Sequence, residues 1–157
     1  MLRISKLTDY ATVILAHLPE DGAGVMTAFE VAERTGVGLP TVSKVLKELQ
    51  RGGLVASTRG AHGGYALARP AGAISAADIL DAVEGPLSLT ECSSHPGQCG
   101  LESNCRVGAS WQRINDAIRR SLRDVSLTQL AGRDAPTVPA PDLAIVLGPR
   151  PGLRPRA

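Results

Sequence analysis

Three cysteines lie close together in the second half of the chain, at Cys92, Cys99 and Cys105, with the spacing C-x6-C-x5-C. Thiolates this close together on a glycine-rich segment can converge on one metal centre, because a flexible backbone lets each sulfur turn inward. His95 lies inside the segment and would complete a Cys3His zinc site. From the spacing alone, a structural zinc ion and an iron–sulfur cluster are equally good occupants.

Other uses of these thiols are less attractive. The odd number of cysteines argues against a disulfide framework, and the spacing is too wide for the C-x-x-C redox motif. Residues 70–105 contain no Lys or Arg that would activate a thiol nucleophile, although His95 could do so. Because no nucleophile, base and orienting group occur as a set, we expect a protein that is not an enzyme.

A basic segment precedes the cysteines and indicates a nucleic-acid partner. The whole chain has a formal net charge of only +2, but residues 40–69 carry five Lys or Arg against the single Glu48. Residues 70–105 instead hold five acidic residues. Basic charge is therefore gathered in one local segment and acidic charge in the next.

The sequence predicts a helix-turn-helix that leads into this segment. Thr27 and Glu30 form a capping box that opens a short helix, which Gly36 ends. Pro40 suits the first turn of a second helix, whose apolar face consists of Val42, Val45, Leu46 and Leu49. The N-terminal residues of such a second helix reach base edges in the major groove. The candidate DNA contacts are Pro40, Thr41, Ser43, Lys44 and Lys47. An ordinary solvated helix face is the alternative, and the basic hairpin that follows favours DNA contact.

The next residues predict that hairpin, and so a winged helix. The runs LVASTRG and YALARP, joined by AHGG, are typical of two strands around a tight connection. Arg59, at a slim glycine-rich tip, suits insertion into a narrow minor groove, and Gly60 and His62 complete the predicted wing contacts. The glycines would also serve turn geometry alone. His62 suits solvent or a phosphate better than a metal.

Further helices must position these segments. A first helix carries an apolar face that ends before Pro19, formed by Ala11, Ile14, Leu15 and Leu18. Ser75 and Asp78 open another helix after the wing. A long helix after the cysteines carries a regular apolar seam that predicts a dimer contact, formed by Trp111, Ile114, Ile118, Leu122 and Val125. The alternative is a helix that packs on its own domain.

We therefore expect a mainly α fold with a small β-wing and a long C-terminal dimerisation helix. The predicted parts are a winged helix-turn-helix domain over residues 1–74, a cluster-binding loop and dimerisation helices over residues 75–131, and a disordered proline-rich tail over residues 132–157. The mean hydropathy is +0.03, and no apolar run approaches the roughly 20 residues that span a bilayer. No signal-peptide cleavage site follows the first apolar stretch. These features predict a cytoplasmic protein with no membrane partner.

Over residues 1–131 the chain resembles the IscR-type family of winged-helix repressors. The matching stretches are RISKLTDYA at the start, GLVASTRGAHGGYALARP across the wing, and the three cysteines before the long helix. The opening LRISKLTDYATVIL is most similar to the branch that regulates the Suf pathway of iron–sulfur cluster assembly. The resemblance implies a homodimer that binds a double-stranded DNA operator, with an iron–sulfur cluster held by Cys92, Cys99 and Cys105.

One position departs from that family. Members that ligate a 2Fe–2S cluster through a histidine carry it three residues after the last cysteine, where this chain has Gly108. Asp9 matches the position at which nitric-oxide-sensing relatives supply an aspartate from the partner subunit, and it also suits a structural role in the first turn of its helix. The candidate fourth ligands are therefore Asp9, His95, and a small thiol or water. Both 2Fe–2S and 4Fe–4S stay open.

The sequence as a whole predicts an iron–sulfur-sensing repressor of cluster assembly genes. One alternative is a nitric-oxide-sensing or redox-sensing repressor of the same family. The other is a zinc-stabilised winged-helix module that binds another protein.

Overall fold

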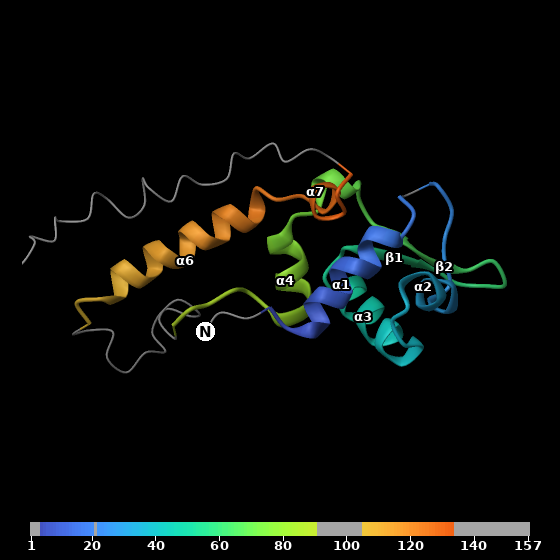
Figure 1. The fold of residues 1–157 in the computed structure, drawn as a ribbon, viewed down its shortest axis with the longest axis horizontal. Coiled ribbons are helices and arrows are strands. Elements are labelled where there is room, and N and C mark those ends of the chain that lie inside the picture. Colours follow the sequence, from blue (N-terminus) through green and yellow to red (C-terminus); the bar gives the residue numbers. More distant parts are fainter. Residues whose placement is uncertain (1–3, 21, 91–104, 134–157) are drawn as a thin grey trace, which may run out of the picture.

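The structure is a computed structural model, which describes residues 4–20, 22–90 and 105–133. Its elements in chain order are α1 (Lys6–His17), α2 (Ala28–Thr35), α3 (Leu39–Arg51), β1 (Val55–Thr58), β2 (Gly64–Leu67), the 3-10 helix η1 (Ala71–Ala73), α4 (Ala76–Glu84), α6 (Gly108–Arg123) and α7 (Leu127–Leu130). Figure 1 shows α1 to α4 and the hairpin gathered in one body, with α6 extending away from it. The predicted mainly helical fold with a small β-wing is confirmed.

Local signals begin and end the helices where the sequence predicts them. Thr27 and Glu30 form a capping box at α2, and Ser75 and Asp78 form one at α4. Gly36 ends α2 with a φ of +70°, a backbone conformation that glycine adopts without strain. The turn between α2 and α3 is therefore short, and the two helices pack against each other.

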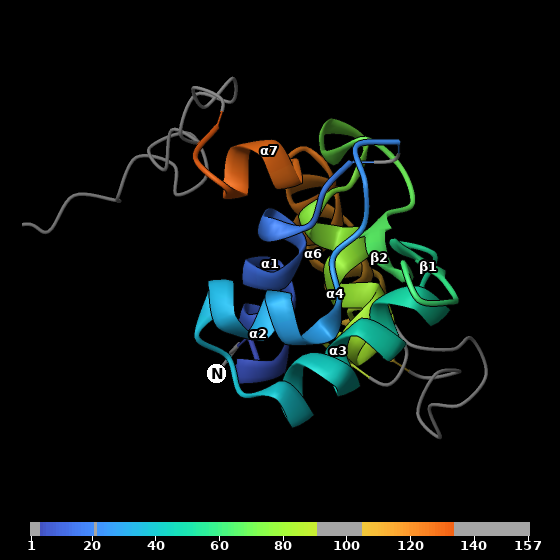
Figure 2. The ribbon, with the colours of Figure 1, turned by 90° about the vertical axis from the view of Figure 1, so that its right-hand side faces the viewer.

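The core is aliphatic and centres on α3. The apolar face of this helix is fully buried and consists of Val42, Val45, Leu46 and Leu49. α1 and α4 both pack against α3 (Figure 2). Ile79 of α4 and Leu127 of α7 belong to the same core. The helices that follow the wing in sequence therefore complete the hydrophobic core of the winged helix.

The wing is anchored at its root by the segment before α2. β1 and β2 pair antiparallel, and Met26 adds a β-bridge to Tyr65 through backbone hydrogen bonds of 2.9 and 2.7 Å. A Cβ on Gly64 would lie 2.8 Å from the carbonyl carbon and oxygen of Met26, so this close approach requires glycine. The base of the wing is thereby fixed, while its turn projects from the body (Figure 1).

Polar contacts tie α6 to the body. Arg119 Nη2 donates to Asp81 Oδ2 of α4 at 2.8 Å. Asn115, which is only 5% exposed, accepts from the backbone N–H of Leu89 at 3.3 Å. α6 ends at Arg123, so Val125 of the predicted seam lies beyond the helix. These contacts decide which side of α6 faces its own protomer.

α7 was not predicted from the sequence. A capping box of Ser126 and Gln129 opens it, and this S-x-x-Q pattern was available as a signal. Arg133 Nη2 then donates to the Ala16 carbonyl at 2.7 Å, which brings the end of the described chain back to α1.

One carboxylate joins the end of α4 to the start of α1. Glu84 Oε1 accepts from the backbone N–H of Ser5, the N-cap residue of α1, at 3.2 Å. The same oxygen accepts from the hydroxyl of Thr8, which is 3% exposed. The Thr8 hydrogen bond lowers the pKa of Glu84 below its ordinary value of 4.5, against a smaller raising effect of burial. One carboxylate thus joins the end of α4 to the start of α1, which are far apart in the sequence.

This contact should make the stability of the fold depend on acid. A carboxyl group whose pKa is lowered by folding stabilises the folded state above its unfolded pKa, and this contribution is lost as the pH falls through the folded pKa. We expect Glu84→Gln to reduce the free energy of unfolding by about 0.5–1 kcal/mol at pH 7, because the carboxylate is exposed. The difference from wild type should shrink as the pH falls below the ordinary range of a glutamate and vanish once the pH is below the folded pKa. Urea unfolding from pH 3 to 7 measures it, with the exposed Glu33→Gln as the charge-matched control. A pH-independent difference would contradict the assignment.

Candidate nucleic-acid interface and metal centre

Burial of one face of α3 leaves the predicted DNA-contact residues on the other. Pro40, Lys44 and Lys47 are exposed, and Thr41 and Ser43 are half-buried. Leu39, the first residue of α3, is 42% exposed, and the sequence analysis did not single it out. The N-terminal end of α3 therefore presents small and apolar side chains, with the lysines following along the helix. Such an end can approach the floor of a major groove closely.

The structure brings one α3 lysine together with the wing. Arg59, Gly60 and His62 are exposed on the wing turn. Lys47 lines an open hollow of about 410 Å³ between α3 and the wing, together with Arg59 and Gly60. The other α3 candidates and His62 are not among the described residues that line this hollow. The predicted contacts thus fall into two groups, one at the N-terminal end of α3 and one between α3 and the wing.

Two further polar residues of this hollow were missed by the sequence analysis. Gln50 Nε2 donates to Ser57 Oγ at 2.8 Å, which links the last turn of α3 to β1. Gln50 lies three residues after Lys47, so helical spacing puts both on one side of the helix, and this signal was available. For Ser57 there was no such signal, because the strand register and the docking of the wing decide which strand side chains face α3.

Cys105 is the one predicted cysteine ligand within the described residues, since Cys92, His95 and Cys99 lie outside them. It is a free, half-buried thiol just before α6. A thiolate is the soft donor that iron–sulfur clusters and zinc both prefer, so the residue fits either. Within residues 4–20, 22–90 and 105–133, no three His, Cys, Asp or Glu gather into a metal site. A centre at Cys105 would therefore take donors from outside these residues of the protomer.

The departure at residue 108 has a clear geometry. Gly108 is the first residue of α6, and a Cβ built on it would lie 3.5 Å from Cys105 Sγ, in ordinary van der Waals contact. A side chain at this position would therefore stand beside the sulfur. Because Gly108 has no side chain, this residue places no ligand beside the Cys105 sulfur.

Asp9 lies on the first turn of α1 and is exposed. The same turn carries Thr8, whose hydroxyl bonds to Glu84 at the end of α4. Glu84 precedes Cys92 by eight positions in the sequence. The turn that holds Asp9 is therefore fastened to the point where the chain enters the cysteine-bearing segment.

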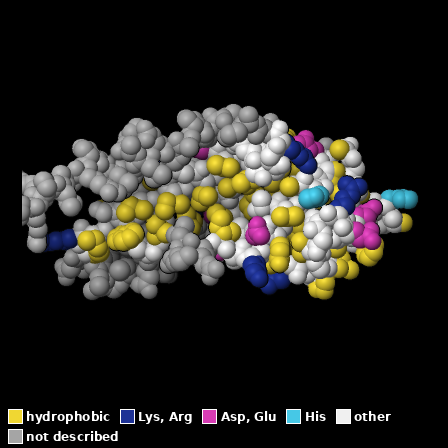
Figure 3. Space-filling view, in the orientation of Figure 1, with side chains coloured by type: hydrophobic (Ala, Val, Ile, Leu, Met, Phe, Trp, Pro, Cys, Tyr) yellow, Lys and Arg dark blue, Asp and Glu magenta, His cyan; other side chains and the backbone are white. Residues whose placement is uncertain are grey.

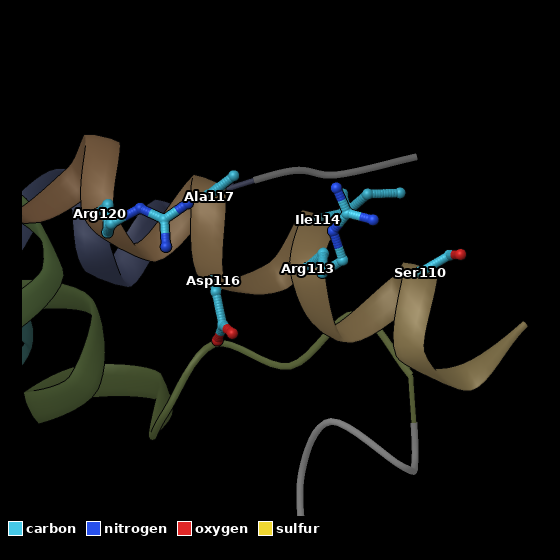
Figure 4. Close-up of a pocket in the computed structure, with 6 residues that line it drawn as sticks. All are labelled: Ser110, Arg113, Ile114, Asp116, Ala117 and Arg120. Atoms are coloured by element: carbon cyan, nitrogen blue, oxygen red, sulfur yellow. The ribbon is translucent and has the colours of Figure 1, made fainter.

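Two large apolar side chains of α6 are exposed among the residues that the structure describes. Trp111 and Ile114 are 43% and 45% exposed, whereas Ile118 and Leu122 are half-buried against their own protomer. Figure 3 shows apolar side chains running along this helix. An open groove of about 620 Å³ also lies against α6 (Figure 4), lined by Ser110, Arg113, Ile114, Asp116, Ala117 and Arg120. The predicted seam is thus exposed in the N-terminal half of α6 and half-buried in its C-terminal half.

None of the described helices combines the length and the apolar character needed to cross a membrane.

Comparison with known proteins places this architecture among transcription regulators. The HTH-type transcriptional regulator IscR of Citrobacter koseri is 29% identical over 130 residues, which cover 82% of this chain and 79% of that protein. The structure of CymR, the global cysteine regulator of B. subtilis, superposes with a TM-score of 0.63 at 30% identity, over 86% of this chain and all of that one. IscR of T. potens superposes with a TM-score of 0.57 at 27% identity, over 88% and 93% of the two chains.

The family match covers the described fold from α1 to the end of α7. Residues 4–133 match the Rrf2 family, which is described as an iron-dependent transcriptional regulator. Its members among the compared proteins are transcription regulators and not enzymes. Together with the winged helix and the exposed face of α3, this match shows that the chain belongs to the Rrf2 family of DNA-binding winged-helix transcription regulators.

Proposed function

We propose that this regulator is a homodimeric repressor of iron–sulfur cluster assembly genes that senses an iron–sulfur cluster. The observation that carries the proposal is the C-x6-C-x5-C segment immediately before α6 in an IscR-like chain. Cys105, the last of these cysteines, is a free thiol just before α6, the helix whose exposed Trp111 and Ile114 would pair with a second subunit. The iron-dependent description of the family supports an iron centre over zinc.

The described contacts suggest how such a centre would reach the DNA-binding face. A bound cluster would supply a redox-sensitive link that holds the cysteine segment in one arrangement. That segment leaves α4 just after Glu84, which is bonded to α1, and it rejoins the described chain at Cys105. α1 and α4 both pack on α3. A change in the segment would therefore shift α1 and α4, the helices that pack on the recognition helix α3.

Two recognition helices in a homodimer should favour an operator with two-fold symmetry. Half-sites would lie about 10 bp, or a multiple of this, apart. Lys44, near the N-terminal end of α3, would reach a guanine edge or a phosphate, and Arg59 would enter a narrow minor groove.

A second candidate function comes from the structural neighbours. CymR of B. subtilis, a global cysteine regulator, superposes on 86% of this chain at 30% identity. A regulator of cysteine-related genes would share the winged helix and the dimer. It would not require iron and sulfide in the purified protein, so metal analysis separates the two functions.

We expect the protein to be brown and to contain iron and acid-labile sulfide when it is purified without oxygen, because three thiolates can hold a cluster. Cys105→Ala should lose this colour and keep the helical circular dichroism, since the thiol is only half-buried. Loaded and metal-free protein should also bind promoter DNA of cluster assembly genes with different affinity. Stoichiometric zinc without iron or sulfide would contradict the cluster and support the zinc-stabilised alternative.

The fourth ligand can be assigned by removing each candidate side chain in turn and by adding a new ligand at residue 108. Asp9→Ala should hasten loss of the cluster absorption in air if Asp9 is the ligand, and His95→Ala should do so if His95 is. Gly108→His would place an imidazole beside Cys105 Sγ, so we expect it to change the visible spectrum. When it is combined with the alanine change at the fourth ligand, the cluster absorption should no longer be lost faster than in wild type. Indifference to both alanine variants, with a normal spectrum for Gly108→His, would point to a ligand from solution.

We expect the exposed N-terminal half of the α6 seam, Trp111 and Ile114, to form the dimer contact. Ile114→Glu should give folded monomers, because Ile114 is 45% exposed in the protomer and a charge buried at an interface is costly. Arg123→Gln changes the net charge by the same amount on the opposite side of the helix and should stay dimeric. Sedimentation velocity with circular dichroism measures both. A folded dimer of Ile114→Glu would place the dimer contact elsewhere.

A further inference from the structure

The hollow between α3 and the wing has the composition of an anion site. It is lined by Thr27, Ala28, Lys47, Gln50, Ser57, Thr58, Arg59, Gly60, Gly63, Gly64 and Tyr65. Lys47 and Arg59 are cationic, and no Asp or Glu belongs to the described lining. The nearby Glu30 is engaged by its capping box with Thr27 and lines a different groove, on the other side of α2. The hollow is open and about 410 Å³ in volume, large enough for part of a polymer chain to enter.

The walls of the hollow are held in place by contacts that do not involve the cations. Gln50 Nε2 donates to Ser57 Oγ at 2.8 Å, which leaves the hydroxyl hydrogen of Ser57 without an acceptor among the described residues. The bridge between Met26 and Tyr65 and the close approach at Gly64 fix β2, the strand in which Tyr65 pairs with Ser57. A positive charge and a hydroxyl donor are therefore held on two elements that face each other across a gap.

We infer that this hollow seats one backbone phosphate of the duplex DNA, held by Lys47 with Ser57 and Gln50. A phosphodiester offers two non-bridging oxygens that share one negative charge, one for the ammonium group and one for the neutral donors. Lys47 is thereby a positioning contact that carries no sequence information, whereas Lys44 lies outside the hollow and nearer the end of α3 that enters the groove. Because α3 and the wing both line the seat, one phosphate sets their common register on the DNA.

The inference rests on the DNA binding of the proposed function, and the test separates the two. The probe is a promoter duplex that the wild-type dimer binds, in which single phosphates are replaced one at a time by neutral methylphosphonates. For wild type we expect one position per half-site at which replacement weakens binding by about 5- to 30-fold, as expected for a lost charge-assisted contact.

Lys47→Gln should bind more weakly and should no longer respond to replacement at that position, because the contact is already lost. Its slope of log affinity against log salt should fall by about 1 per subunit. Lys44→Gln is the matched control on the same helix. It should also bind more weakly, yet keep the full response at that phosphate. Gln50→Leu and Ser57→Ala, which leave the charge unchanged, should each reduce the response in part.

Any of the following results would overturn the inference. If Lys47→Gln and Lys44→Gln respond alike at every phosphate, the hollow is not the seat. If Lys47→Gln instead changes the preference at one base pair, Lys47 is a base contact. Wild-type protein that binds promoter DNA but responds to no single replacement would refute the seat and leave the proposed function standing. Wild-type protein that binds no duplex in either metal state would refute both.

Discussion

Complete burial of one face of α3 is the constraint on which the rest of the structure depends. Because Val42, Val45, Leu46 and Leu49 are all fully buried, the helix has one allowed rotation about its own axis. Truncation of a buried leucine typically costs about 2–5 kcal/mol, a large share of the roughly 5–15 kcal/mol that stabilises a domain. The outward direction of Lys44 and Lys47 is therefore set by the core and needs no contact of their own.

The wing shares this rigidity because it is attached to the same body at two places. The bridge between Met26 and Tyr65 joins it to the segment before α2, and the hydrogen bond from Gln50 to Ser57 joins it to α3. A two-stranded hairpin is marginally stable by itself. Its packing against the helices makes α3 and the wing a single surface, on which side chains from two elements can serve one ligand.

The junction of α1, α4 and α6 gives the cysteine-bearing segment two fixed ends. At one end, Glu84 bonds to Ser5 and Thr8. At the other, Cys105 leads into α6, which is held to the body through Asn115 and Arg119. A rearrangement of the segment that moves either end would act on the contacts of α1, α4 or α6. This would be the physical basis for the proposed coupling of a metal centre to helices that pack on α3.

The sequence by itself determined the local elements and the chemistry of the candidate sites. Capping boxes, Gly36 and the apolar spacing of α3 are interactions between residues a few positions apart, so the sequence shows them directly. The cysteine spacing likewise predicted a metal site, of whose three cysteines the described residues contain only the last. α7 was missed despite a visible capping signal, because four residues are too few for a periodic pattern.

Only the tertiary structure decided which distant residues meet. Glu84 and Ser5 are 79 positions apart, and Ser57 meets Gln50 only because the wing folds back onto α3. It also divided the α6 seam along the helix, since Ile118 and Leu122 near its end are half-buried and Ile114 nearer its start is exposed. Such pairings depend on how whole elements dock, and docking is set by the summed burial of many apolar side chains. No single sequence motif therefore predicts how the elements dock.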